Sequence, residues 1–304
     1  MQLKLKWLTK SVAFLPAPVN TGVLVQQGKA VVVDTGLDKD HANKILKALE
    51  AENLTPVAIV NTHSHADHCG GNAQLQHKRD LPVFAPRLEK PFIEAPYLEA
   101  FGLFGAAHPP AALQNKFLKA KPSQVTGIFE PEDQFWQWED FQVSLVPLPG
   151  HSPQQTGILY EGVLFAADVL LGADYLDKHL IPFNSDVVRH RESLNRLKKM
   201  AVDWCVPAHG IPMEDHLPAV ERNLNALDLI DQWILSNTGQ PATLDHLLSQ
   251  FCSHHGVAME TITQYHLYRT TFAAHASGLV ETGNLSHRVL DGGLVWEVTP
   301  RSST

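Results

Sequence analysis

The segment NTHSHADHCGG, residues 61–71, concentrates residue types that bind metal ions. His63, His65, Asp67 and His68 fall within six positions. They follow TPVAIV, a short apolar run typical of a strand that is buried on both faces. Residues i and i+2 of an extended chain point the same way, so His63 and His65 could bind one ion together. Asp67 and His68 lie just beyond the strand and could face a second ion nearby.

Further ligand types follow other predicted strands. His151 comes after FQVSLVPL, Asp168 after VLFAA and His209 after WCV. Functional sites in open α/β sheets gather at the carboxyl ends of strands. Because ligand-type residues follow three more predicted strands, the interpretation that residues 63–68 are only ordinary polar loop residues is not favoured. The pattern therefore predicts one metal centre assembled from several strand ends.

The segments between these residues predict alternating strands and helices. VNTGVLVQQGKAVVVDTGL indicates two strands joined by a turn at Gln27–Gly28, and residues 38–54 have the apolar stripe of a helix. GILYEGVLFAAD indicates a hairpin. Ser185 is the expected N-cap of a helix over residues 186–200. This alternation predicts an α/β protein with strand ends that present the ligands.

An apolar insert, residues 88–122, interrupts this alternation. We expect it to project as two helical pieces separated at Pro109–Pro110. Tyr97, Phe101 and Phe104 are candidate lining residues of a substrate pocket with an apolar part. The alternative is that the insert buries itself against a second copy of the chain in a homodimer, because exposed apolar patches of this size indicate either role.

The composition shifts after residue 216, where we place a boundary between domains 1–216 and 217–304. The second part predicts helices followed by a hairpin about residues 291–293, the outline of a small winged-helix domain. It holds four basic and eight acidic residues, a charge of −4. Nonspecific nucleic-acid binding depends on neutralising phosphates. The charge therefore favours packing or dimerisation, although an RNA-cleaving role stays open.

The overall composition is that of an ordinary globular protein. The 304 residues are 44% hydrophobic and 18% charged, with a net charge of −8, which gives no general attraction to nucleic acid or anionic membranes. Three distant cysteines predict no disulfide framework. The apolar run near the start is too short for a signal peptide, and no run is long enough to span a membrane. We expect a cytoplasmic protein.

Five motifs, VDTG, THSHADH, PGHS, FAAD and PAHG, resemble in this order the metallo-β-lactamase superfamily. The resemblance covers about residues 18–212. It implies an αββα four-layer sandwich with a dinuclear site at one edge. It also implies that Asp34 orients a ligand from behind. The implied ligands are His63, His65 and His151 for one ion, Asp67, His68 and His209 for the other, and Asp168 as a bridge.

The resemblance implies a hydrolase. A hydroxide held between two divalent ions would attack an ester-type bond, such as a thioester or a lactone, and Asp67 or Asp168 would carry a proton to the leaving group. Imidazole and carboxylate ligands suit zinc best, with iron or manganese as further options. The antibiotic-degrading members use a cysteine where this chain has Asp67, so a β-lactam substrate is not expected.

Two other activities remain open at this stage. Persulfide dioxygenases of the same superfamily bind a single iron, and other members are phosphodiesterases or ribonucleases. Among the hydrolases, the glyoxalase II-like members that bind glutathione carry a basic C-terminal patch, which this chain lacks. A lactonase-like or a glyoxalase II-like hydrolase of a small molecule is the leading hypothesis.

Overall fold

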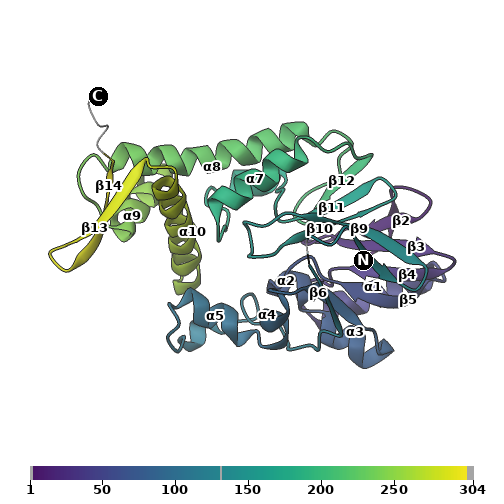
Figure 1. Cartoon of the computed structure of the whole chain (residues 1–304). Helices are drawn as coiled ribbons and strands as arrows, with labels where there is room; N and C mark the ends of the chain where they lie inside the picture. The colour runs from purple at the N-terminus through teal and green to yellow at the C-terminus, as the bar shows by residue number, and fades with distance from the viewer. Residues whose placement is uncertain (1–2, 131, 300–304) are drawn as a thin grey trace.

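Two stacked β-sheets form the centre of the computed structural model, which describes residues 3–130 and 132–299 (Figure 1). The larger sheet holds its seven strands in chain order, antiparallel from the first to the fourth and parallel from the fourth to the seventh. These strands are β1 (Lys6–Trp7), β2 (Val12–Leu15), β3 (Thr21–Gln26), β4 (Lys29–Val33), β5 (Thr55–Val60), β6 (Val83–Pro86) and β7 (Gly127–Phe129).

The smaller sheet has the order β12-β11-β10-β9-β8. Its neighbours are antiparallel except β11 and β12, which are parallel. The strands are β8 (Phe135–Trp138), β9 (Phe141–Pro147), β10 (Thr156–Tyr160), β11 (Val163–Ala167) and β12 (Trp204–Pro207). The predicted turn at Gln27–Gly28 and the predicted hairpin of β10 and β11 are confirmed.

Alternating side chains of the strands fill two different layers. Val31 and Val33 of β4 belong to the core between the sheets, together with Phe141 and Phe165 of the smaller sheet. Val32 lies on the opposite face of β4, in the core under the helices. Because both faces are covered, the run KAVVV is apolar throughout instead of alternating with polar residues.

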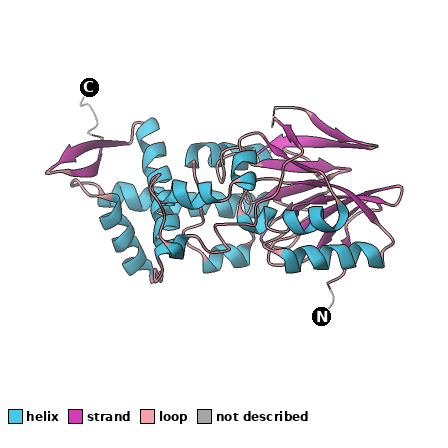
Figure 2. Ribbon diagram, turned by 90° about the horizontal axis from the view of Figure 1, so that it is seen from below, coloured by secondary structure: helices cyan, strands magenta, loops and turns pink. Residues whose placement is uncertain are grey.

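Helices cover the outer face of each sheet (Figure 1), and Figure 2 shows the strands of these two sheets gathered at one end of the molecule with helices alongside. The larger sheet is covered by α1 (Lys39–Ala51) and α3 (Asn72–Arg79), and the smaller sheet by α7 (Val187–Leu197) and α8 (Leu217–Asn237). The predicted αββα four-layer sandwich is therefore confirmed. A single turn of helix, α2 (Ala66–Cys69), continues the ligand segment after β5.

The expected N-cap at Ser185 is wrong by one residue. Asp186 caps α7, and its carboxylate accepts a hydrogen bond from the backbone N–H of Arg189 at 2.9 Å. The hydroxyl of Ser185 instead donates to the carbonyl oxygen of Gly150 at 3.1 Å. Both residue types cap helices well, so the sequence pattern alone could not choose between them.

The insert breaks at a different place from the predicted one. Its two helices, α4 (Lys90–Glu94) and α5 (Tyr97–Leu103), are separated at Ala95–Pro96. The prolines at 109 and 110 are followed only by a single 3₁₀ turn, η1 (Ala111–Leu113). The expectation of a second helical piece after the prolines is wrong.

The C-terminal part continues with α9 (Leu244–His255), α10 (Ile262–Glu281) and the hairpin β13 (Leu285–Leu290) and β14 (Gly293–Val298). Helix α10 extends toward α5 of the insert (Figure 1). There Leu267 packs in one apolar cluster with Ala100, Leu113 and Leu118. Within the described ranges no helix combines the length and the apolar character needed to cross a lipid bilayer.

Candidate metal centre

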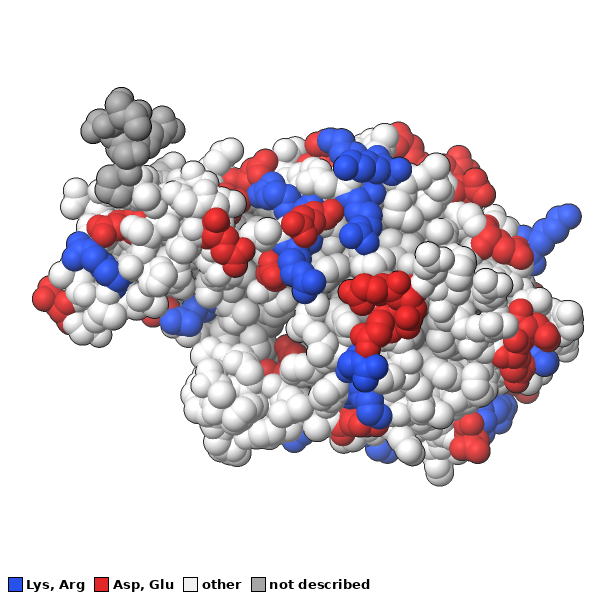
Figure 3. Space-filling view, in the orientation of Figure 1, with Lys and Arg blue, Asp and Glu red and all other residues white. Residues whose placement is uncertain are grey.

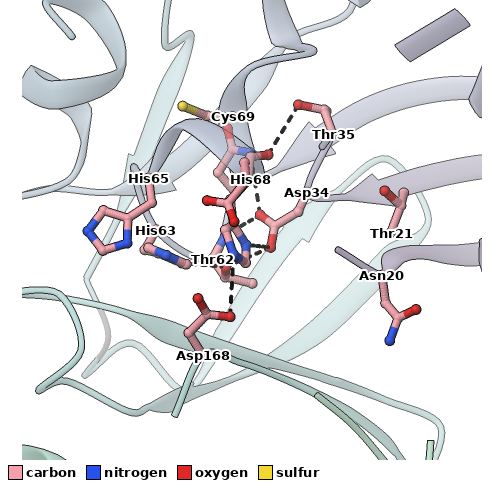
Figure 4. Close-up of polar contacts among 12 residues, drawn as sticks. Asn20, Thr21, Asp34, Thr35, Thr62, His63, His65, His68, Cys69 and Asp168 are labelled. Carbon is pink, nitrogen blue, oxygen red and sulfur yellow. Dashed lines mark hydrogen bonds and ion pairs between the residues drawn. The ribbon is translucent and has the colours of Figure 1, made fainter. Parts of the chain in front are cut away.

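The seven predicted ligands lie together beside the carboxyl ends of β5, β9, β11 and β12, and Figure 4 shows four of them around Asp34. Their ligand atoms form three overlapping groups, and within each group the atoms lie within 4.8 Å of one another. The groups are His63, His65 and His151; His63, His68 and Asp168; and Asp67, His68 and His209. The structure therefore places every predicted ligand at one centre.

The first group consists of three histidines, and we call it the three-histidine group. His65 Nδ1 is 2.8 Å from His151 Nε2. His151 Nδ1 donates a hydrogen bond to the carbonyl oxygen of Phe183 at 2.9 Å. That bond fixes the ring and leaves Nε2 turned toward the other histidines, as expected of a metal ligand whose second nitrogen is held by the protein.

Asp34 orients His68 from behind. Its Oδ2 accepts hydrogen bonds from His68 Nδ1 and from Thr62 Oγ1, both at 2.7 Å, and its Oδ1 accepts from the Thr62 N–H at 2.9 Å. Asp34 itself has a φ of 59°, in the left-handed region that Asp tolerates better than most residues. In neutral His68 the proton is therefore on Nδ1, which leaves the lone pair on Nε2, the atom that lies 3.4 Å from Asp168 Oδ1.

Asp168 lies between the groups. Its Oδ1 is the oxygen that faces His68, whereas its Oδ2 is 3.3 Å from His151 Nε2 and 3.6 Å from His209 Nε2. His209 is held from behind, because its Nδ1 donates to the carbonyl oxygen of Pro18 at 3.0 Å. One carboxylate thus reaches ligands from each of the three overlapping groups.

The buried atoms of this centre fit a cation. Within the described residues, His63 Nε2, His68 Nε2 and Asp168 Oδ1 are buried and have no hydrogen-bond partner. A buried polar atom without a partner costs about 1–3 kcal/mol, so three such atoms aimed at one place require an explanation. A divalent ion would supply the missing partner, and imidazole with carboxylate is a donor set suited to zinc.

In the metal-free centre the pKa values of two histidines are shifted in opposite directions. Burial lowers the pKa of His209, but the carboxylates of Asp168 and Asp67 outweigh it and raise this pKa to about 10. Burial, reinforced by the neighbouring His68, holds the pKa of His63 well below its ordinary value. His209 therefore carries a proton near neutral pH, and an ion that binds there must displace it.

Two adjoining cavities open at the ligands. The smaller, of about 160 Å³, and the larger, of about 510 Å³, share Asp67, Phe117, Tyr175 and His209. The smaller is completed by His65, Ala66, Glu99, Leu118, His151, Asp168, Phe183 and Leu267. The larger is completed by Pro18, Val19, Leu37, His41, Asp174, Lys178, His179 and Gly210. Substrate-sized space therefore adjoins the ligand groups.

The predicted lining residues Tyr97, Phe101 and Phe104 line neither of these two cavities. The Tyr97 hydroxyl lies 3.1 Å from His108 Nδ1, and the Phe104 ring lies against the His266 ring of α10 at 5.3 Å. The insert does reach the centre, but through other residues, namely Glu99, Phe117 and Leu118. The insert thus forms a wall of the cavity with a different face.

Several residues around the centre carry no signal in the sequence. Glu99 of α5 places Oε1 4.0 Å from His65 Nε2, and burial raises the pKa of this carboxyl. The Tyr175 ring, from α6 (Ala173–Lys178), lies 4.8 Å from the His209 ring. Leu267 comes from α10. None of them stands at a recognisable spacing from a ligand, because tertiary packing alone brings them here.

Comparison with known proteins agrees with this geometry. Residues 15–209 match the family model described as the Metallo-beta-lactamase superfamily. A hydroxyacylglutathione hydrolase of Methylobacillus flagellatus is 29% identical over 151 residues, which cover 50% of this chain and 47% of that protein. A probable metallo-hydrolase of Bacillus subtilis is 25% identical over 172 residues, 57% of this chain and 72% of that protein. The chain thus spans about half the length of the first of these relatives.

Solved structures share the fold over nearly the whole chain. A beta-lactamase domain protein from Burkholderia ambifaria has a TM-score of 0.72 at 19% identity, covering 97% of this chain and 93% of that one. A metallo-beta-lactamase family protein from Thermus thermophilus also has a TM-score of 0.72 at 19% identity, covering 96% of this chain and 100% of that one. At these identities the likeness concerns the fold, the C-terminal helices included.

Proposed function

The chain belongs to the metallo-beta-lactamase superfamily, and from this premise we propose that it is a metal-dependent hydrolase of a small, partly apolar ester-type substrate. The observation that carries the proposal is the convergence of the three ligand groups, with buried nitrogen and oxygen atoms that have no hydrogen-bond partner among the described residues. A thioester or a lactone is the bond we propose. The relatives named hydroxyacylglutathione hydrolase support the thioester.

The ligand groups suggest sites for two divalent ions, most simply zinc. Asp168, which lies between the groups, would contact both ions. The chemistry that such ions supply when bound is activation of a water molecule and polarisation of the oxygen at the bond to be cleaved. The proposed ligands are His63, His65 and His151 for one ion and Asp67, His68 and His209 for the other.

The chain itself would orient the ligands and move the proton. Asp34 and the carbonyl oxygens of Phe183 and Pro18 hold the far nitrogens of three histidines, so their rings need not reorganise. Asp67 lines both cavities, which puts its carboxylate within reach of a bound substrate. We assign to Asp67 the transfer of a proton to the leaving group. Asp168 is more deeply buried and is better suited to bridging.

The cavities support a small-molecule substrate. Phe117, Leu118 and Leu267 give the smaller cavity an apolar wall, whereas Lys178 and His179 line the larger one. On the described part of the face in Figure 3, basic side chains are interspersed with acidic ones and form no continuous basic stripe. A basic patch or stripe is the electrostatic footprint of nucleic-acid binding, and the chain as a whole carries a net charge of −8, so we propose a small molecule instead.

Metal analysis followed by a hydrolase panel tests the proposal. We expect about two divalent ions per chain and hydrolysis of at least one member of a panel of thioesters, lactones and phosphodiesters. His65→Ala should lower hydrolysis by at least about 100-fold, because ligand loss removes water activation. His246→Ala, an exposed position on α9, is the matched control and should retain wild-type activity.

Two results would count against the hydrolase. A folded wild-type protein that binds no divalent ion would contradict the proposal outright. One iron per chain together with oxygen consumption would favour a dioxygenase instead.

A further inference from the structure

Glu89 is a buried carboxylate outside the ligand set. It immediately precedes α4, and its side chain is fully buried. Its Oε2 accepts hydrogen bonds from the Ser64 N–H at 3.1 Å and from Ser64 Oγ at 2.5 Å. Its Oε1 accepts from Ser152 Oγ at 2.8 Å and from the Gln154 N–H at 2.9 Å. A single carboxylate therefore takes four hydrogen bonds.

The four donors belong to the two loops that carry the three-histidine group. Ser64 stands between His63 and His65, and Ser152 directly follows His151. Among the described residues no Lys or Arg side chain contacts this carboxylate, so the loops alone compensate for its burial. Isolated burial of a carboxylate is very unfavourable, whereas hydrogen bonds to a charged acceptor are about twice as strong as neutral ones. Glu89 thus joins the two loops rigidly.

We propose that Glu89 is a positioning residue, which fixes the separation of the two loops and thereby the metal affinity of the three-histidine group. The proposal rests on the proposed metal centre. The separation matters because His65 Nδ1 and His151 Nε2 come from different loops and lie only 2.8 Å apart. A shift of either loop moves one ligand relative to the others.

In the group of Asp67, His68 and His209, two ligands have side-chain anchors that do not involve Glu89. Asp34 holds His68, and the carbonyl oxygen of Pro18 holds His209. Neither contact involves Ser64, Ser152 or Gln154. Loss of the Glu89 contacts should therefore weaken one metal-binding step and spare the other, which a general loss of stability would not do.

Glu89→Gln is the most informative substitution. Its side-chain amide has one oxygen that accepts and one NH₂ that only donates. Each half of the Glu89 carboxylate faces a backbone N–H, from Ser64 or from Gln154. Whichever way the amide turns, one of these N–H groups loses its acceptor and one loop is released. Glu89→Ala would leave all four donors without an acceptor and could unfold the chain, so it is not the primary variant.

Thermal unfolding curves first test whether the metal-free wild type and each variant are folded. The folded proteins are then titrated with Zn²⁺ in competition with a chromophoric chelator. We expect Glu89→Gln to weaken one of two binding steps by about 10-fold to 100-fold, the usual effect of losing a partner behind the ligands. Ser152→Ala, which removes one donor, should have a smaller effect on the same step. Glu94→Gln, in the same insert but bonded to Lys90 and the Val125 N–H, should bind as wild type does.

A second measurement does not depend on metal. Hydrogen exchange in the metal-free protein should show faster exchange of the Ser64 or the Gln154 amide in Glu89→Gln than in wild type. The proposal is overturned if Glu89→Gln binds both ions as wild type does, or if both steps weaken equally. Failure of the wild type itself to bind ions would instead overturn the proposed function, so the two failures are distinguishable.

Discussion

Asp34→Asn removes the negative charge that contacts His68 Nδ1 and changes the shape of the side chain very little. Asn tolerates the left-handed backbone at this position (φ 59°) about as well as Asp. Its oxygen can still accept from the Thr62 N–H. Its NH₂, in the place of Oδ2, would face His68 Nδ1 with a donor in place of an acceptor. Neutral His68 must then carry its proton on Nε2, the atom that faces Asp168.

The expected magnitude follows from the bond that is lost. A hydrogen bond to a charged group contributes about 1.5–3 kcal/mol. Loss of a residue that orients a metal ligand costs about 10-fold to 100-fold in affinity, which corresponds to roughly 1.4–2.7 kcal/mol. The two estimates agree. We therefore expect the step that uses His68 to weaken by about that factor in Asp34→Asn.

Competition titration of the metal-free variant with Zn²⁺ measures this effect, and imidazole nitrogen chemical shifts report the tautomer of His68. Asp40→Asn is the control, because Asp40 is exposed on α1 and contacts no ligand. Wild-type affinity of Asp34→Asn for both ions together with an unchanged tautomer of His68 would refute the reasoning that Asp34 sets the tautomer. Normal affinity with a changed tautomer would show that the tautomer does not matter.

Three further outcomes are expected. Phe117→Ala should raise KM about 10-fold with little change in kcat, because Phe117 lines both cavities and is 63% exposed. The control is Phe135→Ala on β8, where Phe135 is 51% exposed, and it should change neither KM nor kcat. The pKa of His209 is raised from 6.5 to about 10, so its stabilisation of the metal-free fold is complete below pH 6.5 and is lost as the pH rises toward 10. Urea unfolding of chelator-treated protein should show this fall in stability between pH 7 and 10, and a smaller fall in His209→Ala. Thr261→Ala removes the capping box of α10 and should lower the unfolding free energy by about 1 kcal/mol in thermal denaturation.

The convergence of the candidate ligands could be predicted because local sequence patterns indicate it. His63, Asp168 and His209 each follow a short, largely apolar run that forms a strand, and His151 follows β9, in which apolar and polar residues alternate. The carboxyl ends of such strands meet at one edge of a sheet. The αββα layers follow from the same runs, since strands that are apolar on both faces need a cover on both sides.

The walls of the cavity could not be predicted in this way. Tyr97 and Phe101 are four residues apart on α5, so they share a face, and their rings pack against each other at 5.8 Å. The apolar face of α5 was expected to meet the substrate, but the structure turns Glu99 toward the ligands. Which face of a short helix meets a cavity depends on the packing of distant segments. The role of Glu89 could not be predicted for the same reason, because its four donors lie 25 to 65 positions away.

The roof of the smaller cavity is made of two pieces of chain that meet only in three dimensions. Leu118 of the insert and Leu267 of α10 pack together there, and a hydrogen bond between Asn115 and Thr263 joins positions 148 residues apart. Neither piece supplies any of the seven proposed ligands. Mutations on either piece can therefore reshape the space beside the proposed metal centre without changing a proposed ligand. Substrate range could then change during evolution, or be altered by protein engineering, in either piece while the chemistry stays constant.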